Sequence, residues 1–358
     1  MRNDLLRTIR EAGRRIDEAA FPDGTKLLLM PHGGRVLGLF GPRDDENFFW
    51  TNPALDGVES ARSLFESAGW HNPGGDRTWL APEVDFFLPN YPKLDRYAQP
   101  RELDAGAYSV EKEPGRYAMC REVRASLSRS KIDVAVEIRK EIGPAPDPLR
   151  RERRLALPGD VEYAGYTLRT TVRVLEHRGP GEAWVGPWSL LQLPHGGVLI
   201  VATHGPAAPL LCFGKLNPDD LVLGERMVLW RMTAPGEHKI ALRAVAVTGR
   251  AGYLHGAGDR ACLVVRNFGV NPSGEYVDAP WSDPDDLGYA LQACNVQSAL
   301  GAFSELEHHA PAVKIGGDRP AEDVSQAWAY RGKIDAIRAV AERLLGPLPE
   351  AAGSPCPW

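Results

Sequence analysis

The sequence predicts a mainly β chain: a single large antiparallel β-sandwich flanked by a helix at each end. Three observations support this prediction. In residues 131–142 and again in 165–175, every second residue is apolar or large. In a strand these residues share one face, so the pattern predicts strands with one buried and one solvated face. Helical spacing of apolar residues is clear only near the two ends. The 30 prolines and 37 glycines favour many short strands joined by sharp turns.

The first element predicted is an amphipathic helix over residues 2–20. Its apolar residues recur at spacings of three and four, namely Leu5, Leu6, Ile9, Ala12, Ile16 and Ala19. The same spacing returns from Ile334 to Leu345, and Gly346-Pro347 ends that helix. These patterns divide the chain into a helical extension (1–25), a β-sandwich domain (26–325) and a C-terminal helix with a tail (326–358).

Between the helices, apolar and β-branched runs bounded by turn residues predict the strands in order. They cover residues 27–30, 36–40, 78–81, 117–126, 131–142, 165–175, 183–192, 198–203, 227–233, 239–247, 261–267 and 302–308. No βαβ alternation is seen, so the sheets are expected to be antiparallel.

Composition excludes several classes of partner. The chain is 43% hydrophobic and 25% charged, with a net charge of −5 and no basic run, so no nucleic-acid or membrane partner is expected.

Its five cysteines are scattered, which is typical of free thiols in a reducing compartment. The N-terminus lacks the apolar core of a signal peptide, so we expect a cytoplasmic protein. The oligomeric state stays open.

Residues 69–92, GWHNPGGDRTWLAPEVDFFLPNYP, are the first candidate site. Four prolines and Gly74-Gly75 predict an irregular loop around a short strand at 78–81. Loops dense in polar and aromatic side chains often carry function. Arg77 and Trp79 are two residues apart, so a strand would place both on one face.

Residues 301–311, GAFSELEHHAP, are the second candidate. A strand here places Glu305 and Glu307 on one face, where their repulsion lets one keep its proton near neutrality and the two supply an acid and a base. The alternative is that one or both of these carboxylates pair with arginines on a solvated sheet face. His308 and His309 point to opposite faces and cannot easily share an ion, so no metal is expected.

Tryptophans and absent motifs narrow the class of ligand. Several of the nine tryptophans lie beside turn residues, and flat apolar rings of this kind suit the CH faces of sugars, the alternative being burial in the core. The chain has no G-x-S-x-G elbow and no phosphate-binding P-loop.

The order of four motifs resembles the galactose mutarotase-like (aldose 1-epimerase-like) superfamily, in particular its uncharacterised bacterial branch. The motifs are GGRVLGLFGPRDDENFFWTNP (33–53), NPGGDRTWLAPE (72–83), AWVGPWSLLQLPHGG (183–197) and ELEHHAP (305–311). The resemblance implies a β-supersandwich of galactose mutarotase type whose concave face binds a carbohydrate, a monosaccharide or short saccharide. It also implies acid/base ring opening that needs no cofactor.

Within this resemblance, Glu307 matches the catalytic glutamate, and Glu305 is the alternative if the register differs by two. The central strand has Pro187-Trp188-Ser189 where the epimerases carry a histidine, so His71, His177 or His195 would have to supply the acid, and His71 is the candidate in the first loop. The implied sugar-binding residues are Asn72, Asp76, Arg77, Trp79, Glu83, Trp188, Gln192 and His309.

Three functions follow from this sequence. The first is an aldose 1-epimerase-like isomerase with Glu307 as the base. The second is a sugar-binding or sensing module without catalysis. The third is a glycoside-transforming enzyme that uses Glu305 and Glu307.

Overall fold

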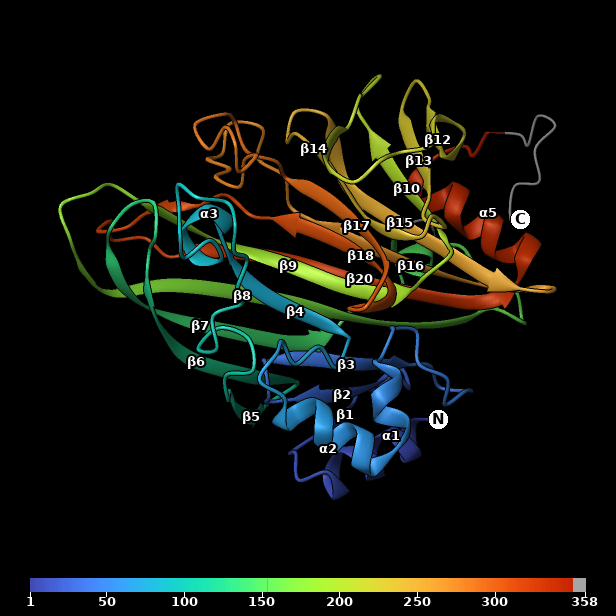
Figure 1. Cartoon of the computed structure of the whole chain (residues 1–358). Helices are drawn as coiled ribbons and strands as arrows, with labels where there is room; N and C mark the ends of the chain where they lie inside the picture. Colours follow the sequence, from blue (N-terminus) through green and yellow to red (C-terminus); the bar gives the residue numbers. More distant parts are fainter. Residues whose placement is uncertain (153, 350–358) are drawn as a thin grey trace.

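Two antiparallel β-sheets form most of the protein in a computed structural model, which describes residues 1–152 and 154–349 (Figure 1). The strand order of the first sheet is β1-β2-β3-β4-β9-β18-β17-β14-β11, with β19 paired to β9. The order of the second is β12-β13-β10-β15-β16-β20-β8-β7-β6-β5. The prediction of a mainly β sandwich with antiparallel sheets is confirmed.

The first sheet carries both candidate sequence motifs. Its strands are β1 (Asp17–Ala20), β2 (Lys26–Met30), β3 (Arg35–Phe40), β4 (Asp76–Ala81), β9 (Trp184–Pro194), β11 (Leu210–Phe213), β14 (Gly236–Leu242), β17 (Leu291–Ser298), β18 (Gly301–His309) and β19 (Val313–Lys314). The first loop motif contributes β4 and the late acidic motif contributes β18.

The second sheet holds the longest strands. They are β5 (Ser109–Glu113), β6 (Arg116–Ser126), β7 (Asp133–Pro144), β8 (Glu162–Arg178), β10 (Val198–Thr203), β12 (Leu221–Leu223), β13 (Met227–Arg231), β15 (Val247–Ala257), β16 (Arg260–Phe268) and β20 (Ala321–Lys333). The alternation read in 131–142 and 165–175 lies in β7 and β8, which pair with each other.

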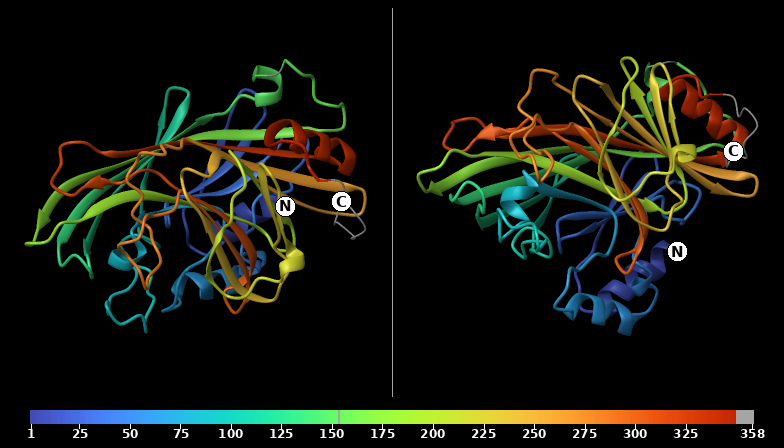
Figure 2. Two further views of the ribbon diagram at one scale, coloured as in Figure 1. Left: turned by 90° about the horizontal axis from the view of Figure 1, so that it is seen from above. Right: turned by 45° about the horizontal axis from the view of Figure 1, so that its top comes forward.

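The described residues include five helices, three of which cover outer faces of the sheets. They are α1 (Arg2–Glu11), α2 (Val58–Glu66), α3 (Glu83–Phe86), α4 (Pro148–Glu152) and α5 (Ile334–Leu345), with 3-10 turns η1 (Pro53–Asp56) and η2 (Pro218–Asp220). α1 and α2 bury apolar residues against β2 and β3, and α5 does so against β15, β16 and β20. Figures 1 and 2 show these two helical groups on different sides of the molecule.

The core lies between the sheets. Leu191 of β9 and Leu306 of β18 point inward from the first sheet, and Tyr166 and Val264 point inward from the second. Each of these side chains is at most 2% exposed, and burying one of them contributes about 1.5–3 kcal/mol. Since side chains alternate along a strand, the neighbours of Leu191 and Leu306 face away from this core.

Two predicted elements differ from the structure. The N-terminal helix ends at Glu11 rather than at residue 20, because Gly13 adopts a φ of 80° and the chain then turns into β1, which pairs with β2. The strand predicted over 239–247 is divided between β14 and β15, because a turn intervenes in which the Ala246 N–H donates to the Arg243 carbonyl.

The expected boundaries between segments, at 25/26 and 325/326, lie next to or within strands. β1 belongs to the first sheet although it lies within 1–25, and the boundary at 325/326 falls inside β20, which pairs along its length with β8. The C-terminal helix matches α5, and residues 350–358 of the expected tail lie outside the described residues. None of the described helices is both long and apolar enough to cross a bilayer. Cys120, Cys212, Cys262 and Cys294 are free thiols.

Candidate functional site

Strand pairing gathers most of the predicted site residues on one face of the first sheet, the face opposite the core. On this outer face Trp79 lies beside Trp188, which lies beside His309. Two residues further along β9, Leu190 lies between Arg77 of β4 and Glu307 of β18. After two more residues, Gln192 of β9 pairs with Glu305 of β18. The period-two prediction for Glu305 and Glu307 therefore matches the structure, and β9 joins β4 to β18.

The first loop enters this face through a sharp turn at Gly74-Gly75. Their φ angles are 103° and 77°, and a Cβ atom would lie 2.3 Å from the Trp50 carbonyl oxygen at Gly74 and 2.5 Å from that of Val36 at Gly75. Only glycine fits such positions without strain. The turn places Asp76 at the start of β4, opposite Val36 and Leu191.

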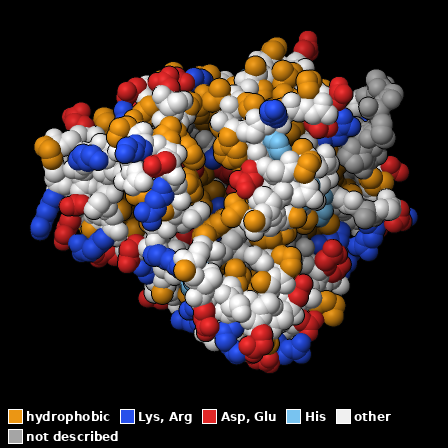
Figure 3. Space-filling model, viewed as in Figure 1, with side chains coloured by type: hydrophobic (Ala, Val, Ile, Leu, Met, Phe, Trp, Pro, Cys, Tyr) orange, Lys and Arg blue, Asp and Glu red, His pale blue; other side chains and the backbone are white. Residues whose placement is uncertain are grey.

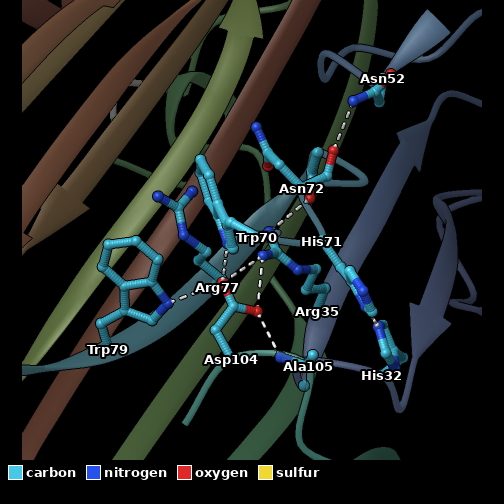
Figure 4. Close-up of polar contacts among 12 residues, drawn as sticks. His32, Arg35, Asn52, Trp70, His71, Asn72, Arg77, Trp79, Asp104 and Ala105 are labelled. Atoms are coloured by element: carbon cyan, nitrogen blue, oxygen red, sulfur yellow. Dashed lines mark hydrogen bonds and ion pairs between the residues drawn. The ribbon is translucent and has the colours of Figure 1, made fainter. Parts of the chain in front are cut away.

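One carboxylate, Asp104, fixes the side chains around this turn (Figure 4). It accepts two hydrogen bonds from Arg35, at 2.8 and 2.9 Å, and one from each indole N–H of Trp70 and Trp79, at 2.7 and 3.1 Å. Burial alone would raise the pKa of Asp104, but Arg35 and Arg77 more than offset it and hold the pKa below its usual value. Asp104 therefore stays ionised and holds the two tryptophans in place.

Arg77 is held by Glu305 and by aromatic rings. Its Nη1 donates to Glu305 Oε1 at 2.8 Å, and its guanidinium lies 5.1 Å from the ring of Trp70 and 4.2 Å from that of Trp79. Arg77 is 1% exposed and Glu305 is 6% exposed. The pair has the arginine partner of the alternative expected for the acidic motif, but it is buried rather than on a solvated face.

Glu307 belongs to a second group, the carboxylate cluster, which we define as Glu83, Asp278 and Glu307 around Lys239. The Lys239 ammonium lies 3.2 Å from Glu307 Oε2 and 3.9 Å from Glu83 Oε2. The indole N–H of Trp188 donates to Glu307 at 3.0 Å. The cluster thus places three carboxylates against one ammonium in a buried environment.

Asp278 connects the cluster to the segment between β16 and β17. It accepts hydrogen bonds from the Glu83 backbone N–H and from Gln292 Nε2, both at 2.8 Å. His309 Nε2 lies 3.6 Å from Asp278 Oδ2, and the imidazole stacks on Trp188 with ring centroids 5.2 Å apart. Within residues 1–152 and 154–349, the hydrogen-bond partners of Asp278 are neutral groups.

Burial raises the pKa values of the carboxyl groups in the carboxylate cluster, which favours their protonated, neutral forms. Burial, with Glu305 and Glu83 nearby, raises the pKa of Glu307 to about 7 even though Lys239 opposes the shift. Burial also raises the pKa of Glu83 and of Asp278. Burial and then Lys239 hold the pKa of His309 well below its usual value, so its ring is neutral at pH 7.

A cavity of about 520 Å³, the Lys239 cavity, opens beside the cluster. Its polar wall is formed by Glu83, Lys239, Asp278 and Gln292, and Trp281 and Tyr289 add aromatic rings. Trp281 donates its indole N–H to Glu83 Oε2 at 2.9 Å and stacks on Tyr97. Figure 3 shows a hollow near the centre of the visible face with acidic and basic atoms inside it. Such a concave site with convergent polar groups suits a small ligand.

Three predicted site residues, His71, Asn72 and Asp76, do not lie on the outer face of the first sheet. The His71 ring contacts His32 at 3.2 Å, the Ser67 carbonyl at 2.8 Å and Arg101 at 3.2 Å, away from Arg77 and Trp79 (Figure 4).

Asn72 lies in the same loop and accepts a hydrogen bond from Asn52 through its backbone carbonyl. Asp76 points into the core between the sheets, where Arg266 binds it at 2.8 Å and Tyr166 donates to it. The reason is strand alternation, since Asp76 and Arg77 must face opposite ways.

The other predicted residues are on the outer face but are buried there. Trp79 and Trp188 are 4% and 1% exposed, so neither presents a free ring, and Gln192 is 0% exposed. Arg77 is likewise committed to Glu305 rather than open to a ligand. Glu83 is the predicted binding residue that lines the cavity. Of the alternative histidines, His177 lies in β8 of the second sheet and His195 follows β9.

Sequence reasoning missed Lys239 and Asp278, and it included Trp281 only among the tryptophans that lie beside turn residues. Lys239 was assigned only to a strand, and Asp278 and Trp281 come from an irregular segment without a motif. The pairing of β14 with β17 and of β17 with β18 brings Lys239 near Glu307. The sequence signal for this cluster is Lys239, which begins the apolar run that ends at Leu242. A lysine buried in a strand requires an anion as its partner.

One trio of side chains has the donor set for a metal ion. Cys294, Glu305 and Glu307 place one potential ligand atom each within 4.8 Å of the others. Both carboxylates are already held by cations, Glu305 by Arg77 at 2.8 Å and Glu307 by Lys239 at 3.2 Å. Burial also raises the pKa of the Cys294 thiol well above its usual value, which disfavours the thiolate that a metal requires.

Comparisons with known proteins bear on the fold. No family model matches the chain, and no curated protein matches it. Among solved structures, it is similar to a galactose mutarotase-like protein from Lactobacillus casei, with 9% identity and a TM-score of 0.47 over 88% of this chain and 100% of that one. The similar solved structures include galactose mutarotase-like proteins.

Two further structures illustrate the range of similarity. The Slr1438 protein from Synechocystis has 12% identity and a TM-score of 0.49 over 89% of this chain and 96% of that one. A galactose 1-epimerase from Lactobacillus acidophilus has 8% identity and a TM-score of 0.39 over 89% of this chain and 99% of that one. At such identities the likeness concerns the fold and assigns no activity.

Proposed function

We propose that this chain binds a carbohydrate in the Lys239 cavity and interconverts its anomers by acid/base ring opening. The observation that carries the proposal is the position of Glu307, a carboxyl with a pKa of about 7 that lies one contact behind the cavity wall. A base with a pKa near the working pH combines a large ionised fraction with useful proton affinity. The motif resemblance favours the same residue.

The proposed chemistry uses groups of the carboxylate cluster. Glu307 takes the proton of the C1 hydroxyl by way of Lys239, which lines the cavity 3.2 Å from Glu307, and the ring oxygen receives a proton from the protonated form of Glu83. Glu83 lines the cavity and burial raises its pKa, so it retains its proton at a pH where an exposed carboxyl does not. The C1–O5 bond breaks, the C1–C2 bond rotates, and reclosure gives the other anomer.

Trp281 and Gln292 are proposed to position the sugar. Trp281 lines the cavity with a half-buried ring, unlike Trp79 and Trp188, and can stack on the CH face of a pyranose. Gln292 carries two N–H donors and one acceptor oxygen, and one of the N–H groups already serves Asp278. In this arrangement Arg77 and Glu305 support the wall and do not touch the sugar.

The test is proton exchange spectroscopy on a panel of aldoses that includes glucose and galactose. We expect exchange between anomers to be faster than in buffer with the wild type, and to fall to the buffer rate in Glu307→Gln. Glu322→Gln, on the exposed side of β20, is the matched control and should exchange like the wild type. Wild-type exchange no faster than buffer for every aldose would reject the epimerase activity.

A second candidate function is sugar binding without catalysis. One observation favours it: the Glu307 side chain is 1% exposed and is already bonded to Trp188 and Lys239. Calorimetry separates the two functions, because a sugar that binds but keeps its buffer exchange rate indicates a binding module. Glycoside cleavage by Glu305 and Glu307 gains less support, since Glu305 holds Arg77 and both carboxylates extend from one strand rather than flanking a substrate.

A further inference from the structure

The charges that line the Lys239 cavity are unbalanced. Glu83, Asp278, Asp283 and Asp286 contribute carboxylates to its wall, and Lys239 contributes the one cation among the described lining residues. Arg243, which is outside the wall, neutralises Asp286 through two contacts of 2.8 and 3.0 Å. The remaining acids still outnumber Lys239.

Asp278 is a buried carboxylate of the wall with no cation in direct contact among the described residues, although the charge of Lys239 acts on it from a greater distance. Lys239 is engaged by Glu307 and Glu83, and the groups that contact Asp278 are the Gln292 amide, the Glu83 backbone N–H and the His309 ring. The His309 ring is neutral at pH 7 because its pKa is held well below the usual value. Buried carboxylates without a cation favour any bound group that brings a positive charge.

A second, independent observation points to a ligand in the same place. Gln292 is 4% exposed and lines the cavity, and its side-chain oxygen has no hydrogen-bond partner within residues 1–152 and 154–349. A buried amide oxygen without a partner costs about 1–3 kcal/mol, so a donor from a ligand would stabilise it. Gln292 Nε2 bonds Asp278 Oδ2, which places two acceptors on adjacent side chains.

The group that matches this wall is an ammonium. It carries three donors and no acceptor, so it can bond a carboxylate and an amide oxygen together. The rings of Trp281 and Tyr289 line the same cavity and attract a cation through their π faces. A phosphate or carboxylate would instead face Asp278, Glu83 and Asp283.

We propose that the preferred ligand is an amino sugar whose ammonium binds between Asp278 and Gln292. This inference rests on the proposed sugar binding and narrows its substrate class, since it ranks amino sugars above neutral sugars and neutral sugars above phosphosugars or uronic acids.

The experiment is calorimetric titration of the full chain at pH 7 with four sugars that differ in charge. They are glucose, 2-amino-2-deoxyglucose, 6-amino-6-deoxyglucose and glucose 6-phosphate. Because a hydrogen bond to a charged group is worth about 1.5–3 kcal/mol, we expect at least one amino sugar to bind roughly tenfold more tightly than glucose. Glucose 6-phosphate should bind most weakly.

The variant Asp278→Asn keeps the shape of the side chain and removes its charge. It should abolish the preference, so that the amino sugar and glucose bind with similar Kd. Asp285→Asn is the matched control, because Asp285 adjoins the wall residue Asp286 in sequence but its side chain is 85% exposed, where solvent screens its charge. The control should keep the tenfold preference.

The outcomes separate the two proposals. Amino sugars that bind no better than glucose, or a phosphosugar that binds best, would overturn the present inference and leave sugar binding intact. Failure of all four sugars, and of the wider aldose panel, to bind would overturn both. Since the comparison of ligands uses the wild type, it stands even where Asp278→Asn fails to fold.

Discussion

Replacing Glu307 by glutamine should change how the stability of the protein depends on pH. In the folded protein the pKa of Glu307 is raised to about 7 from an ordinary value of 4.5, chiefly by burial. Between these two values the folded state holds a proton that the unfolded state releases. Stability therefore falls as pH rises from 4.5 to 7, and this contribution is fully lost above the folded pKa.

The size of the effect follows from the difference between the two pKa values. At about 1.4 kcal/mol for each pKa unit, a rise from 4.5 to about 7 corresponds to about 3 kcal/mol. Glutamine does not titrate, so the variant lacks this loss. Below the folded pKa the wild-type Glu307 is itself neutral, so replacing it by glutamine takes no anionic partner from Lys239, 3.2 Å away, in that range.

Urea unfolding of the wild type and Glu307→Gln from pH 5 to pH 8 measures the effect. The free energy of unfolding of the variant, minus that of the wild type, should rise by about 2–3 kcal/mol over this range. Glu322→Gln, which changes an exposed carboxylate, should show a nearly constant difference. A constant difference for Glu307→Gln as well would refute a raised pKa, and with it the basis for Glu307 as the base.

Three further substitutions test the roles of single residues. Arg77→Ala leaves Glu305 buried without its cation, so urea unfolding should show a loss of about 3–5 kcal/mol, and a double variant that also removes Glu305 should recover part of it. His71→Ala removes a contact with His32 and should lower the free energy of unfolding by about 1 kcal/mol, while the calorimetric Kd for sugar stays unchanged. A tenfold weaker Kd would instead show that His71 takes part in sugar binding. Trp281→Ala should weaken sugar binding roughly tenfold in the same titration, and an unchanged Kd would remove its ring from the proposed binding surface.

Much of the fold could be predicted because strand alternation is a local property. The apolar period in 131–142 and 165–175 marks β7 and β8, and the helical period in 334–345 marks α5. The helix predicted over 2–20 fails after Glu11, because Ile16 and Ala19 fit the helical spacing but are buried by β1 and its neighbours. Tertiary pairing overrides local spacing there.

The site was less predictable because it depends on which strands pair. The sequence places Glu305, Glu307 and His309 on one face, but it does not state that β17 and β14 lie beside them and bring Lys239 to Glu307. Nor does the sequence show that the Asp104 carboxylate accepts hydrogen bonds from the indole N–H groups of both Trp70 and Trp79. Burial of Trp79 and Trp188 likewise depends on segments distant in sequence.

The turn at Gly74-Gly75 has a consequence for how related sequences should be compared. Both glycines are required by backbone atoms of Trp50 and Val36, and neither contacts the Lys239 cavity wall. Homologues with different ligands, or with none, should therefore keep the pair, whereas Asp278 and Trp281 should vary with the ligand. In an alignment, the most invariant positions of this loop would mark the shape of the chain, and the more variable segment between β16 and β17 would record what each homologue binds.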